Sequence, residues 1–337
     1  MTETPSRPVS PEAHDDSLLP FAVEPLDLRG RLVRLGPTVD AILKHYDYPE
    51  PVARLLGEAL ALATLLGSIL ESHGRFQLQT RSDGPVDMLV VDYDAPGKLR
   101  GFARYDAARV AAFEAAGART QPARLFGRGH LALTIERDAD AARYQGVVPL
   151  EGESLAEAAH TYFQQSEQIP SFVRLAVGEA VTAQGRVWRA GGLLLQYLPE
   201  HGGRIRDLPG GDASPQDEDD DEDSGFDDND FVEDAWSEGR ALAETLADHE
   251  LIDPGLSGER LLYRLFHERG VTIFRERALE EFCRCSDARI EGLLRSFSPR
   301  ERADMIGDDG SIGVTCEFCS TQRSYDPAAF DSGGSDD

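Results

Sequence analysis

Four cysteines near the C-terminal end are the residues of this chain best suited to chemistry. They form two close pairs, Cys283 with Cys285 and Cys316 with Cys319, and the sequence contains no other cysteine. The pattern is C-x-C, thirty residues, then C-x-x-C. Two pairs of thiolates suit a tetrahedral zinc site, because Zn²⁺ accepts four sulfur ligands without geometric strain. The spacing therefore predicts one Zn²⁺ per chain, held by all four cysteines.

Two roles for such a site stay open at this point. The simpler one is a structural staple, since most sites with four cysteines are structural. The second is a redox switch, because each pair could also close as an internal disulfide, which in C-x-C is a small, strained and easily reduced ring. Structural zinc contributes roughly 10–16 kcal/mol to the folding of small zinc peptides. Oxidation that removed the ion would therefore unfold the module around the cysteines.

Sequence signatures of catalysis are missing elsewhere. The chain has no Gly-rich phosphate loop, no Gly-x-Ser-x-Gly elbow and no His-Glu-x-x-His motif. Histidines are scattered without a partner at metal or triad spacing, and we interpret these six as structural: His45, His73, His130, His160, His249 and His267. The sequence favours a binding protein over an enzyme, with no catalytic residue predicted.

The charge of the chain is strongly acidic but unevenly distributed. The formal net charge is −27, and fifteen of the acidic residues lie between Asp207 and Glu238, where no Lys or Arg occurs. Without that stretch the remainder carries −12, from −27 + 15. An acidic chain repels phosphate backbones, so nucleic acid is a poor general partner.

The sequence also predicts where the protein resides. Cysteines confined to a metal-like pattern indicate a reducing compartment rather than a disulfide scaffold. Residues Met1–Pro20 lack the apolar stretch of a secretory signal. The most apolar run, Ala59–Leu70, is twelve residues, which is too short to span a bilayer. We expect a cytoplasmic protein without a membrane partner.

An α+β domain is predicted over residues 26–205, because many short strands alternate with turns and few helices. Its strands are expected at 28–36, 75–80, 86–93, 99–105, 130–136, 144–149, 172–179 and 187–198. Its helices are expected at 39–44, 52–72 and 154–168, the last opened by a Ser154-x-x-Glu157 capping box. Gly57 and Gly67 in the long helix would allow close backbone packing.

The flanking segments differ from this domain in composition. Residues 1–25 are Pro-rich and 331–337 are rich in Gly, Ser and Asp, and both read as disordered tails. Residues 206–230 include seven consecutive carboxylates and predict a flexible acidic loop. Residues 231–280 predict a metastable linker with helices at 231–247 and 257–268, which must lean on a neighbouring domain to persist. The zinc module is expected over 281–330, with helices at 289–297 and 299–305 and a strand at 310–315.

These motifs together resemble the heat shock protein 33 family of redox-regulated holdase chaperones. The specific part is Cys283-Arg-Cys285-Ser, the thirty-residue gap and Cys316-Glu-Phe-Cys319. Five other stretches support the resemblance: Leu55-Leu-Gly-Glu-Ala-Leu60, Arg81-Ser-Asp-Gly-Pro85, Gln145-Gly-Val-Val-Pro149, Tyr162–Pro170 and Tyr263-Arg-Leu-Phe-His267. It covers roughly residues 26–330. The tail 1–25 and the acidic tract 212–230 look like additions to the family pattern.

The resemblance implies a mechanism. In that family the reduced protein binds one Zn²⁺ through its four cysteines and is inactive. Oxidants form two disulfides, which here would be Cys283–Cys285 and Cys316–Cys319, and the zinc is released. The module and the linker then unfold, and the exposed surface binds unfolding client proteins without ATP. The active form is a homodimer, and clients later pass to ATP-dependent foldase chaperones.

Two other functions fit parts of the pattern. A zinc-ribbon module for nucleic-acid or ribosome binding predicts basic residues around the cysteines, and six arginines occur there among Asp and Glu: Arg284, Arg289, Arg295, Arg300, Arg302 and Arg323. A thiol oxidoreductase using Cys316 and Cys319 would need a free, accessible pair, usually in a thioredoxin-like βαβ context that this region lacks.

Overall fold

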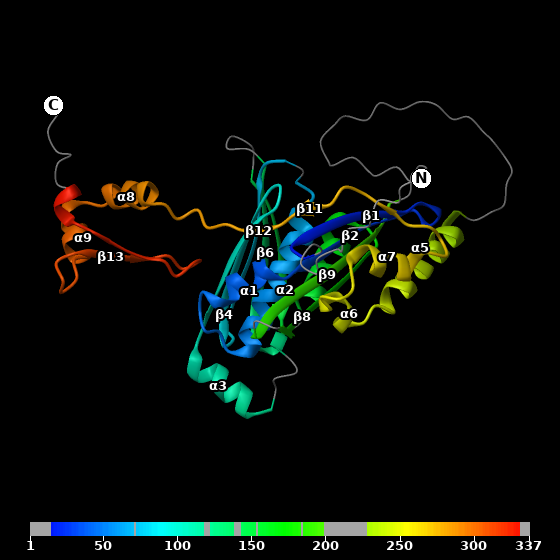
Figure 1. Cartoon of the computed structure of the whole chain (residues 1–337), viewed down its shortest axis with the longest axis horizontal. Helices are drawn as coiled ribbons and strands as arrows, with labels where there is room; N and C mark the ends of the chain where they lie inside the picture. Colours follow the sequence, from blue (N-terminus) through cyan, green and yellow to red (C-terminus); the bar gives the residue numbers. More distant parts are fainter. Residues whose placement is uncertain are drawn as a thin grey trace, which may run out of the picture.

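The computed structural model describes residues 15–70, 72–117, 122–137, 143–152, 154–182, 185–198 and 228–330. In these ranges the strands form two six-stranded sheets, called sheet A and sheet B here, and one two-stranded hairpin (Figure 1). This mixture of helices and strands confirms the predicted α+β class. None of the helices in the described ranges is both long and apolar enough to cross a membrane.

Sheet A has the strand order β10-β1-β2-β9-β8, and β11 pairs with the other end of β1. Its strands are β1 (Ser17–Val23), β2 (Leu28–Leu35), β8 (Ser171–Thr182), β9 (Gly185–Tyr197), β10 (Thr272–Ile273) and β11 (Arg277–Ala278). All of these pairings are antiparallel. The short strands β10 and β11 come from the C-terminal third of the chain, so sheet A joins distant parts of the sequence.

Strand β1 corrects the prediction of a disordered tail over residues 1–25. Pro20 lies in the middle of β1, and its carbonyl accepts a hydrogen bond from Phe274 N at 2.9 Å. On this side β1 pairs with β10 at residues 21–22 and with β11 at residues 17–18, and Pro20 lies between the two pairings. The N–H group that proline lacks is therefore not needed for a hydrogen bond to a neighbouring strand. Leu18 and Phe21 are buried on opposite faces of the sheet. Residues 1–14, 206–227 and 331–337 of the predicted tails and acidic loop lie outside the described residues.

Sheet B has the strand order β12-β5-β4-β3-β6-β7. Its strands are β3 (Arg75–Ser82), β4 (Val86–Asp94), β5 (Lys98–Tyr105), β6 (Arg128–Glu136), β7 (Tyr144–Glu151) and β12 (Glu280–Glu281). In this sheet only β12 pairs in parallel, with β5. The other neighbours pair antiparallel, and β6 lies beside β3 rather than beside β5. The eight strands expected from alternating patterns all occur, within two or three residues of the predicted ends.

The long helix α2 (Glu50–Gly67) lies between the two sheets and is buried along most of its length (Figure 1). An added Cβ at Gly57 would lie 2.8 Å from Val177 of sheet A, and one at Gly67 would lie 2.7 Å from Tyr93 of sheet B. Both glycines therefore permit the close packing predicted for them. Three further helices complete this part: α1 (Pro37–Lys44), α3 (Ala107–Ala115) and α4 (Leu155–Tyr162). A π-helical turn, η5 (Phe163–Glu167), follows α4, and Gln168 ends it in the left-handed region with φ 53°.

The linker helices cover the outer face of sheet A. They are α5 (Asp228–Glu244), α6 (Asp248–Ile252) and α7 (Gly258–Phe266). Leu251, Leu261 and Phe266 are buried against this face, and the ring of Phe266 stacks on Phe21 at 5.6 Å. Helix α5 starts three residues inside the predicted acidic loop, since acidic residues suit the first turn of a helix. Short helices that lean on a neighbouring domain are thus confirmed.

After α7 the chain crosses from sheet A to the edge of sheet B and enters a small C-terminal module (Figure 1). Its elements are α8 (Asp287–Ser296), α9 (Pro299–Asp304), β13 (Ile312–Thr315), β14 (Gln322–Tyr325) and the 3-10 turn η6 (Pro327–Phe330). The buried core of this module consists of Ile290, Leu294, Ile312 and Phe330.

Candidate metal centre

Two turns carry the four cysteines. Cys283 and Cys285 lie between β12 and α8, and Ser286 directly after them caps α8 by accepting a hydrogen bond from Arg289 N. Cys316 and Cys319 lie in the turn between β13 and β14. This turn is closed by two backbone hydrogen bonds, from Cys316 N to Thr321 O at 3.0 Å and from Ser320 N to Cys316 O at 2.9 Å.

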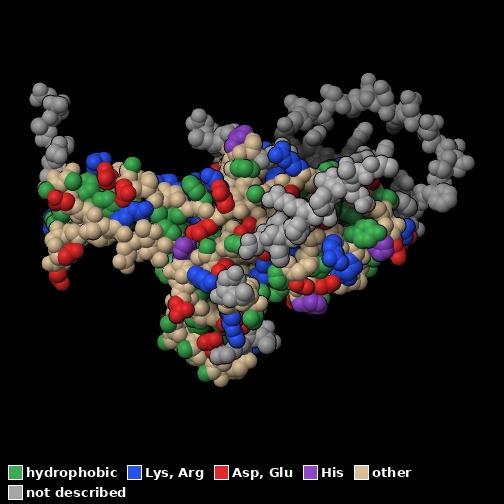
Figure 2. Space-filling model, in the orientation of Figure 1, with side chains coloured by type: hydrophobic (Ala, Val, Ile, Leu, Met, Phe, Trp, Pro, Cys, Tyr) green, Lys and Arg blue, Asp and Glu red, His purple; other side chains and the backbone are tan. Residues whose placement is uncertain are grey.

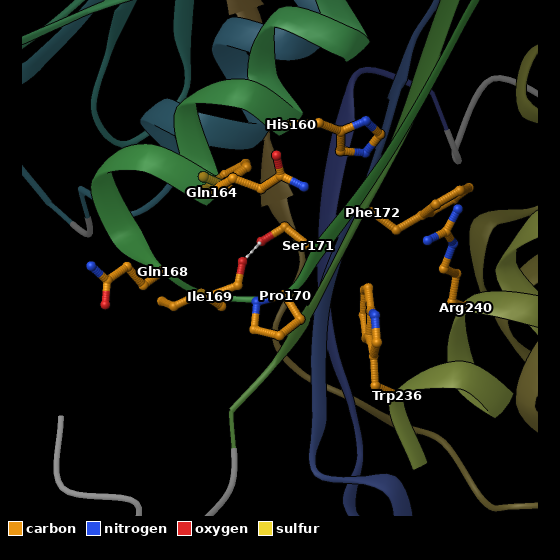
Figure 3. A pocket seen from close by; sticks show the side chains of 10 residues that line it. His160, Gln164, Gln168, Ile169, Pro170, Ser171, Phe172, Trp236 and Arg240 are labelled. Carbon is orange, nitrogen blue, oxygen red and sulfur yellow. Dashed lines mark hydrogen bonds between the residues drawn. The ribbon is translucent and has the colours of Figure 1, made fainter. Parts of the chain in front are cut away.

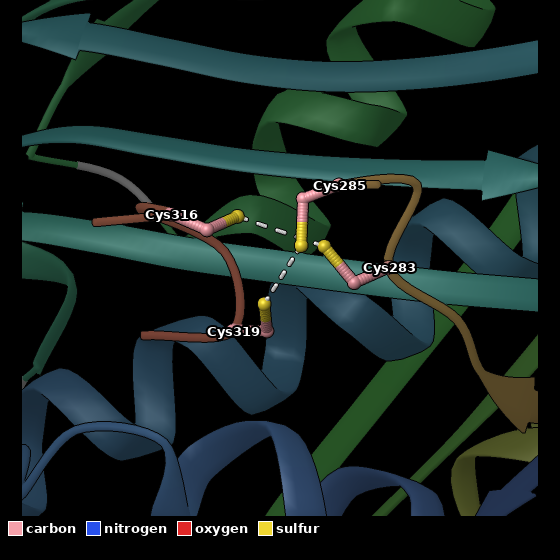
Figure 4. A group of neighbouring side chains, drawn as sticks. All are labelled: Cys283, Cys285, Cys316 and Cys319. Atoms are coloured by element: carbon pink, nitrogen blue, oxygen red, sulfur yellow. Dashed lines mark hydrogen bonds between the residues drawn. The ribbon is translucent and has the colours of Figure 1, made fainter. Parts of the chain in front are cut away.

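The structure brings all four predicted sulfur atoms together, within 4.8 Å of one another (Figure 4). Cys283 Sγ lies 3.6 Å from Cys316 Sγ, and Cys285 Sγ lies 3.3 Å from Cys319 Sγ. Tetrahedral zinc with Zn–S bonds of about 2.3 Å separates its sulfur ligands by roughly 3.8 Å. The four thiols therefore fit a single metal ion, and the all-sulfur donor set suits zinc.

The sulfur atoms differ in their acidity. Burial raises the pKa of the Cys283 thiol to about 12, and burial also raises the pKa of Cys285. For Cys319 burial is outweighed by hydrogen bonds from Thr321 and by neighbouring thiols, which lower its pKa to about 6. The Thr321 hydroxyl lies 3.2 Å from Cys319 Sγ. A bound cation would favour the thiolate form at every position, because coordinating thiols are deprotonated.

Arg323 is a charged neighbour of the centre that sequence reasoning counted only as a basic residue. Its guanidinium donates to Cys285 Sγ at 3.4 Å and to Cys285 O at 3.1 Å, and it pairs with Asp287 at 2.9 Å. A guanidinium beside a thiolate stabilises the negative charge, as outer partners of metal ligands often do.

The residues enclosed by the two cysteine turns dock the centre on sheet B. Phe318, inside C-x-x-C, packs edge-on against Phe102 with ring centroids 4.9 Å apart, and the guanidinium of Arg100 lies 3.9 Å from its centroid. Met88 and Val90 are buried in the same cluster. This contact covers an apolar patch on the face of sheet B opposite α2.

Arg284, inside C-x-C, makes the second docking contact. It donates to Asp94 at 2.9 Å and to Asp92 at 3.4 Å. Asp92 is buried, with 1% of its surface exposed, and also accepts from Arg100. The signal available in the sequence was the arginine between the two cysteines and the aromatic residue between the other two, and neither reveals its partner on β4 and β5.

Helix α1 and its C-terminal end also meet the centre. Tyr46 donates its hydroxyl hydrogen to Cys316 O at 3.2 Å. His45 Nε2 lies 2.5 Å from a carboxylate oxygen of Glu281 in β12.

A second histidine, His160, lies away from the centre and accepts a hydrogen bond from Val173 N at 2.9 Å. These two histidines have the structural roles expected of them.

Comparisons with known proteins agree over nearly the whole chain. The family model described as Hsp33 protein matches residues 16–326. The 33 kDa chaperonin of Caulobacter vibrioides strain NA1000 / CB15N is 46% identical over 313 residues, covering 93% of this chain and 95% of that protein. The 33 kDa chaperonin of Pseudomonas aeruginosa strain LESB58 is 36% identical over 315 residues, covering 93% of each.

A solved structure shows the same fold. It is the crystal structure of the 33 kDa chaperonin from Thermotoga maritima, with a TM-score of 0.68, 19% sequence identity, and coverage of 94% of this chain and 96% of that one. The match of the family model and the identity to the curated relatives agree with the sulfur cluster and with the two-sheet core. The chain belongs to the Hsp33 family of chaperones.

Proposed function

We propose that this protein is a redox-regulated, ATP-independent holdase of the cytoplasm. In the reduced state Cys283, Cys285, Cys316 and Cys319 would hold one Zn²⁺, and the protein would be inactive. On oxidation the cysteines would form two disulfides, the zinc would be lost, and the linker 231–280 would unfold and leave a surface for unfolding client proteins.

The observation that carries this proposal is the small core of the C-terminal module. Its buried apolar residues in the described segment 287–330 are Ile290, Leu294, Ile312 and Phe330. A module with so little buried apolar surface is not expected to fold without a metal or another staple. When bound, zinc would tie the segment after β12 to the β13–β14 turn. Its loss would remove most of the free energy that folds the module.

The pairing of the sulfur atoms decides whether oxidation opens or locks the module. A disulfide between Cys283 and Cys316 would join segments 33 residues apart and keep the module stapled. Pairing within each turn, Cys283 with Cys285 and Cys316 with Cys319, leaves the segments free to separate. We propose the second pairing. Each disulfide forms when two thiolates give two electrons to one peroxide molecule, which two solvent protons convert to two waters.

The module and the linker are connected through a crossing segment that pairs with both sheets by short strands. Strands β10, β11 and β12 have two residues each. Arg277 fastens the crossing by donating to Ser68 O at 2.8 Å and Leu70 O at 3.3 Å, at the end of α2. Lys98 lies 4.0 Å from the ring centroid of Phe282, next to the first cysteine. Unfolding of the module would free one end of this crossing.

The contact between the linker and the core is not completely filled. A cavity of about 520 Å³ lies between α5 and the segment from α4 to β8 (Figure 3). Trp236 and Arg240 of α5 line one side, and His160 and Phe172 of the core line the other. Incomplete packing of this kind forgoes part of the stabilisation that a close-packed interface provides. The linker is therefore suited to reversible release.

The arginines near the cysteines favour structural roles over nucleic-acid binding. Arg284, Arg295 and Arg323 are each paired with a carboxylate. On the visible face of the module, acidic and basic side chains are interspersed (Figure 2). Family membership supports client proteins as partners. We further propose, from the resemblance, that the active form is a homodimer and that clients pass to ATP-dependent foldases.

The test is a peroxide titration of the full-length protein at elevated temperature. Zinc release, loss of free thiols and suppression of citrate synthase aggregation are followed together, and peptide mapping locates the disulfides. We expect the three signals to change together, with both disulfides inside the turns. Protein kept reduced at the same temperature is the control. Zinc loss without a gain in aggregation suppression, or a compact C-terminal half after oxidation, would contradict the proposal.

A further inference from the structure

Helix α6 of the linker lies in a close-fitting site on the outer face of sheet A, called the α6 seat here. Its floor is formed by Gly178 of β8 and Gly191 of β9. An added Cβ at Gly191 would lie 2.6 Å from Leu251 O, and one at Gly178 would lie 2.7 Å from Ile252 Cδ1. Any larger residue would push the helix away, so the two glycines let its backbone approach the sheet.

Two buried arginines complete the seat at the C-terminal end of α6. Arg189 donates from Nε to Ile252 O at 2.6 Å. Arg34 donates to Glu250 O at 3.5 Å and also to Asp253 O. The last carbonyl groups of a helix have no partner within the helix and carry partial negative charge. The two guanidinium groups thus recognise a general property of helix ends rather than a particular side chain.

The seat holds more positive charge than its own strands neutralise. Arg34 and Arg189 are 1% and 4% exposed, and Asp15 pairs with both. The other carboxylates that act on Arg34, Asp253 and Glu259, belong to the linker. In the described part of the chain, Arg34 Nε is buried without a hydrogen-bond partner. When the linker leaves, two cations and one anion remain beside an apolar surface.

Apolar neighbours give the seat an amphipathic character. Leu32, Ala176, Leu193 and Leu195 are buried on the same face of the sheet under the linker helices. At the opposite end of α6, Arg174 pairs with Asp248 at 2.8 Å, which suits an acidic residue in the first turn of a helix. The seat therefore matches a short amphipathic helix in shape, in apolar surface and in the direction of its dipole.

We propose that, in the open state, the α6 seat binds the C-terminal end of an amphipathic helix in a partly folded client, with Arg34 and Arg189 donating to its terminal carbonyl oxygens. This inference rests on the proposed function, because the linker must leave first. Helix α6 then acts as an internal competitor that occupies the seat in the resting state. Clients that retain helical ends are bound in preference to fully extended chains.

The test measures how the oxidised full-length protein binds two fluorescent, hydrocarbon-stapled amphipathic helices. Both carry a Leu-Ile pair in the last turn, and one ends in a free carboxylate while the other ends in Lys-Lys-amide. We expect the carboxylate probe to bind at least about tenfold more tightly, since the guanidinium groups attract its carboxylate and repel the lysines of the other probe. Equal affinity of the two probes would overturn the assignment.

Three variants locate the effect. Arg189→Met should abolish the preference, whereas Arg186→Met, on the same strand with a side chain 75% exposed, should keep it. Gly178→Val keeps both arginines and fills the floor, because an added Cβ there meets only Ile252 of α6 within 4 Å. The Gly178→Val variant should release its linker at a lower peroxide concentration than wild type and yet bind the carboxylate probe more weakly. Retained preference in Arg189→Met, or tighter probe binding by Gly178→Val, would contradict the seat.

The outcome separates this inference from the proposed function. Oxidised wild-type protein that suppresses citrate synthase aggregation but does not distinguish the probes refutes the seat alone. Oxidised protein that neither suppresses aggregation nor binds either probe refutes both.

Discussion

The C-terminal third of the chain rests on the core at two places that differ in kind. On sheet A the linker shares a cluster of eighteen buried apolar residues, among them Phe21 and Phe266. On sheet B the cysteine centre covers three buried residues, Met88, Val90 and Phe102, with one ring, Phe318. The first contact is large and apolar, and the second is small and relies on Arg100 and Arg284.

The two contacts therefore depend on different interactions. Burial of apolar side chains, worth about 1.5–3 kcal/mol for each large residue, is the main stabilisation of the closed linker on sheet A. The module has a much smaller apolar core, and the proposed zinc would supply the stabilisation that its apolar contacts lack. The proposed metal-dependent switch therefore lies at the weaker contact, and its state would reach the stronger contact through the crossing at β10, β11 and β12.

The largest expected effect comes from removing one sulfur ligand. Cys283→Ser should abolish stable zinc binding and unfold the module. In small zinc peptides the binding of zinc contributes roughly 10–16 kcal/mol, and this free energy drives their folding. Zinc per chain and hydrogen exchange of residues 283–330 are the measurements. Ser324→Ala in the same module, which leaves all sulfur atoms in place, is the control. Unchanged exchange protection in Cys283→Ser would show that the module does not depend on the metal.

The next effect tests the apolar contact on sheet A. Phe266→Ala should destabilise the closed linker by about 3–5 kcal/mol, because a fully buried aromatic ring is lost from its contact with Phe21. Hydrogen exchange should rise in residues 234–270 while zinc stays bound. Tyr263→Ala on the same helix is the control, since Tyr263 is 64% exposed. Loss of zinc from Phe266→Ala would show that the contact on sheet A and the metal centre on sheet B do not act independently.

Much of this arrangement could be predicted from the sequence. The four cysteines identified the centre because their side chains and spacing are rare and specific, and the structure brings all four together. Local patterns predicted eight of the nine long strands in the described residues, and the glycines of α2 predicted its close packing. These features depend on residues near one another in the chain.

The rest depends on contacts between distant segments. Strand β1 was hidden by Pro20, whose place at an interrupted edge no local pattern reveals. Helix α6 has five residues and no periodicity long enough to detect. Arg34 and Arg189 lie on predicted strands, and only the fold places the end of α6 over them. The two-residue strands of the crossing exist only because β1 and β5 offer free edges.

A smaller effect is expected for the contact on sheet B. Phe318→Ala removes the edge-on packing with Phe102 and the contact with Arg100, which together contribute about 1–3 kcal/mol. The module should separate from β4 and β5 while the cysteines still hold zinc. Hydrogen exchange of residues 86–105 and zinc retention are measured together. Glu317→Ala in the same turn, at an exposed position, is the control. Loss of zinc in Phe318→Ala would mean that docking, rather than sulfur ligation, keeps the module folded.

The smallest effect concerns a carboxyl group on helix α2. Burial raises the pKa of Glu58 on α2 to about 7, Arg54 opposes the shift, and Asp248 of α6 adds to it. The folded protein thus holds a proton that the unfolded chain releases at a pKa of about 4.3, so this group's stabilisation is present below pH 4.3 and lost as the pH rises through 7. Glu58→Gln should therefore be more stable than wild type by about 1 kcal/mol at pH 8, with the difference shrinking towards pH 5, in urea unfolding curves. The exposed Glu151→Gln is the control, and a pH-independent difference would exclude titration of Glu58 as the cause.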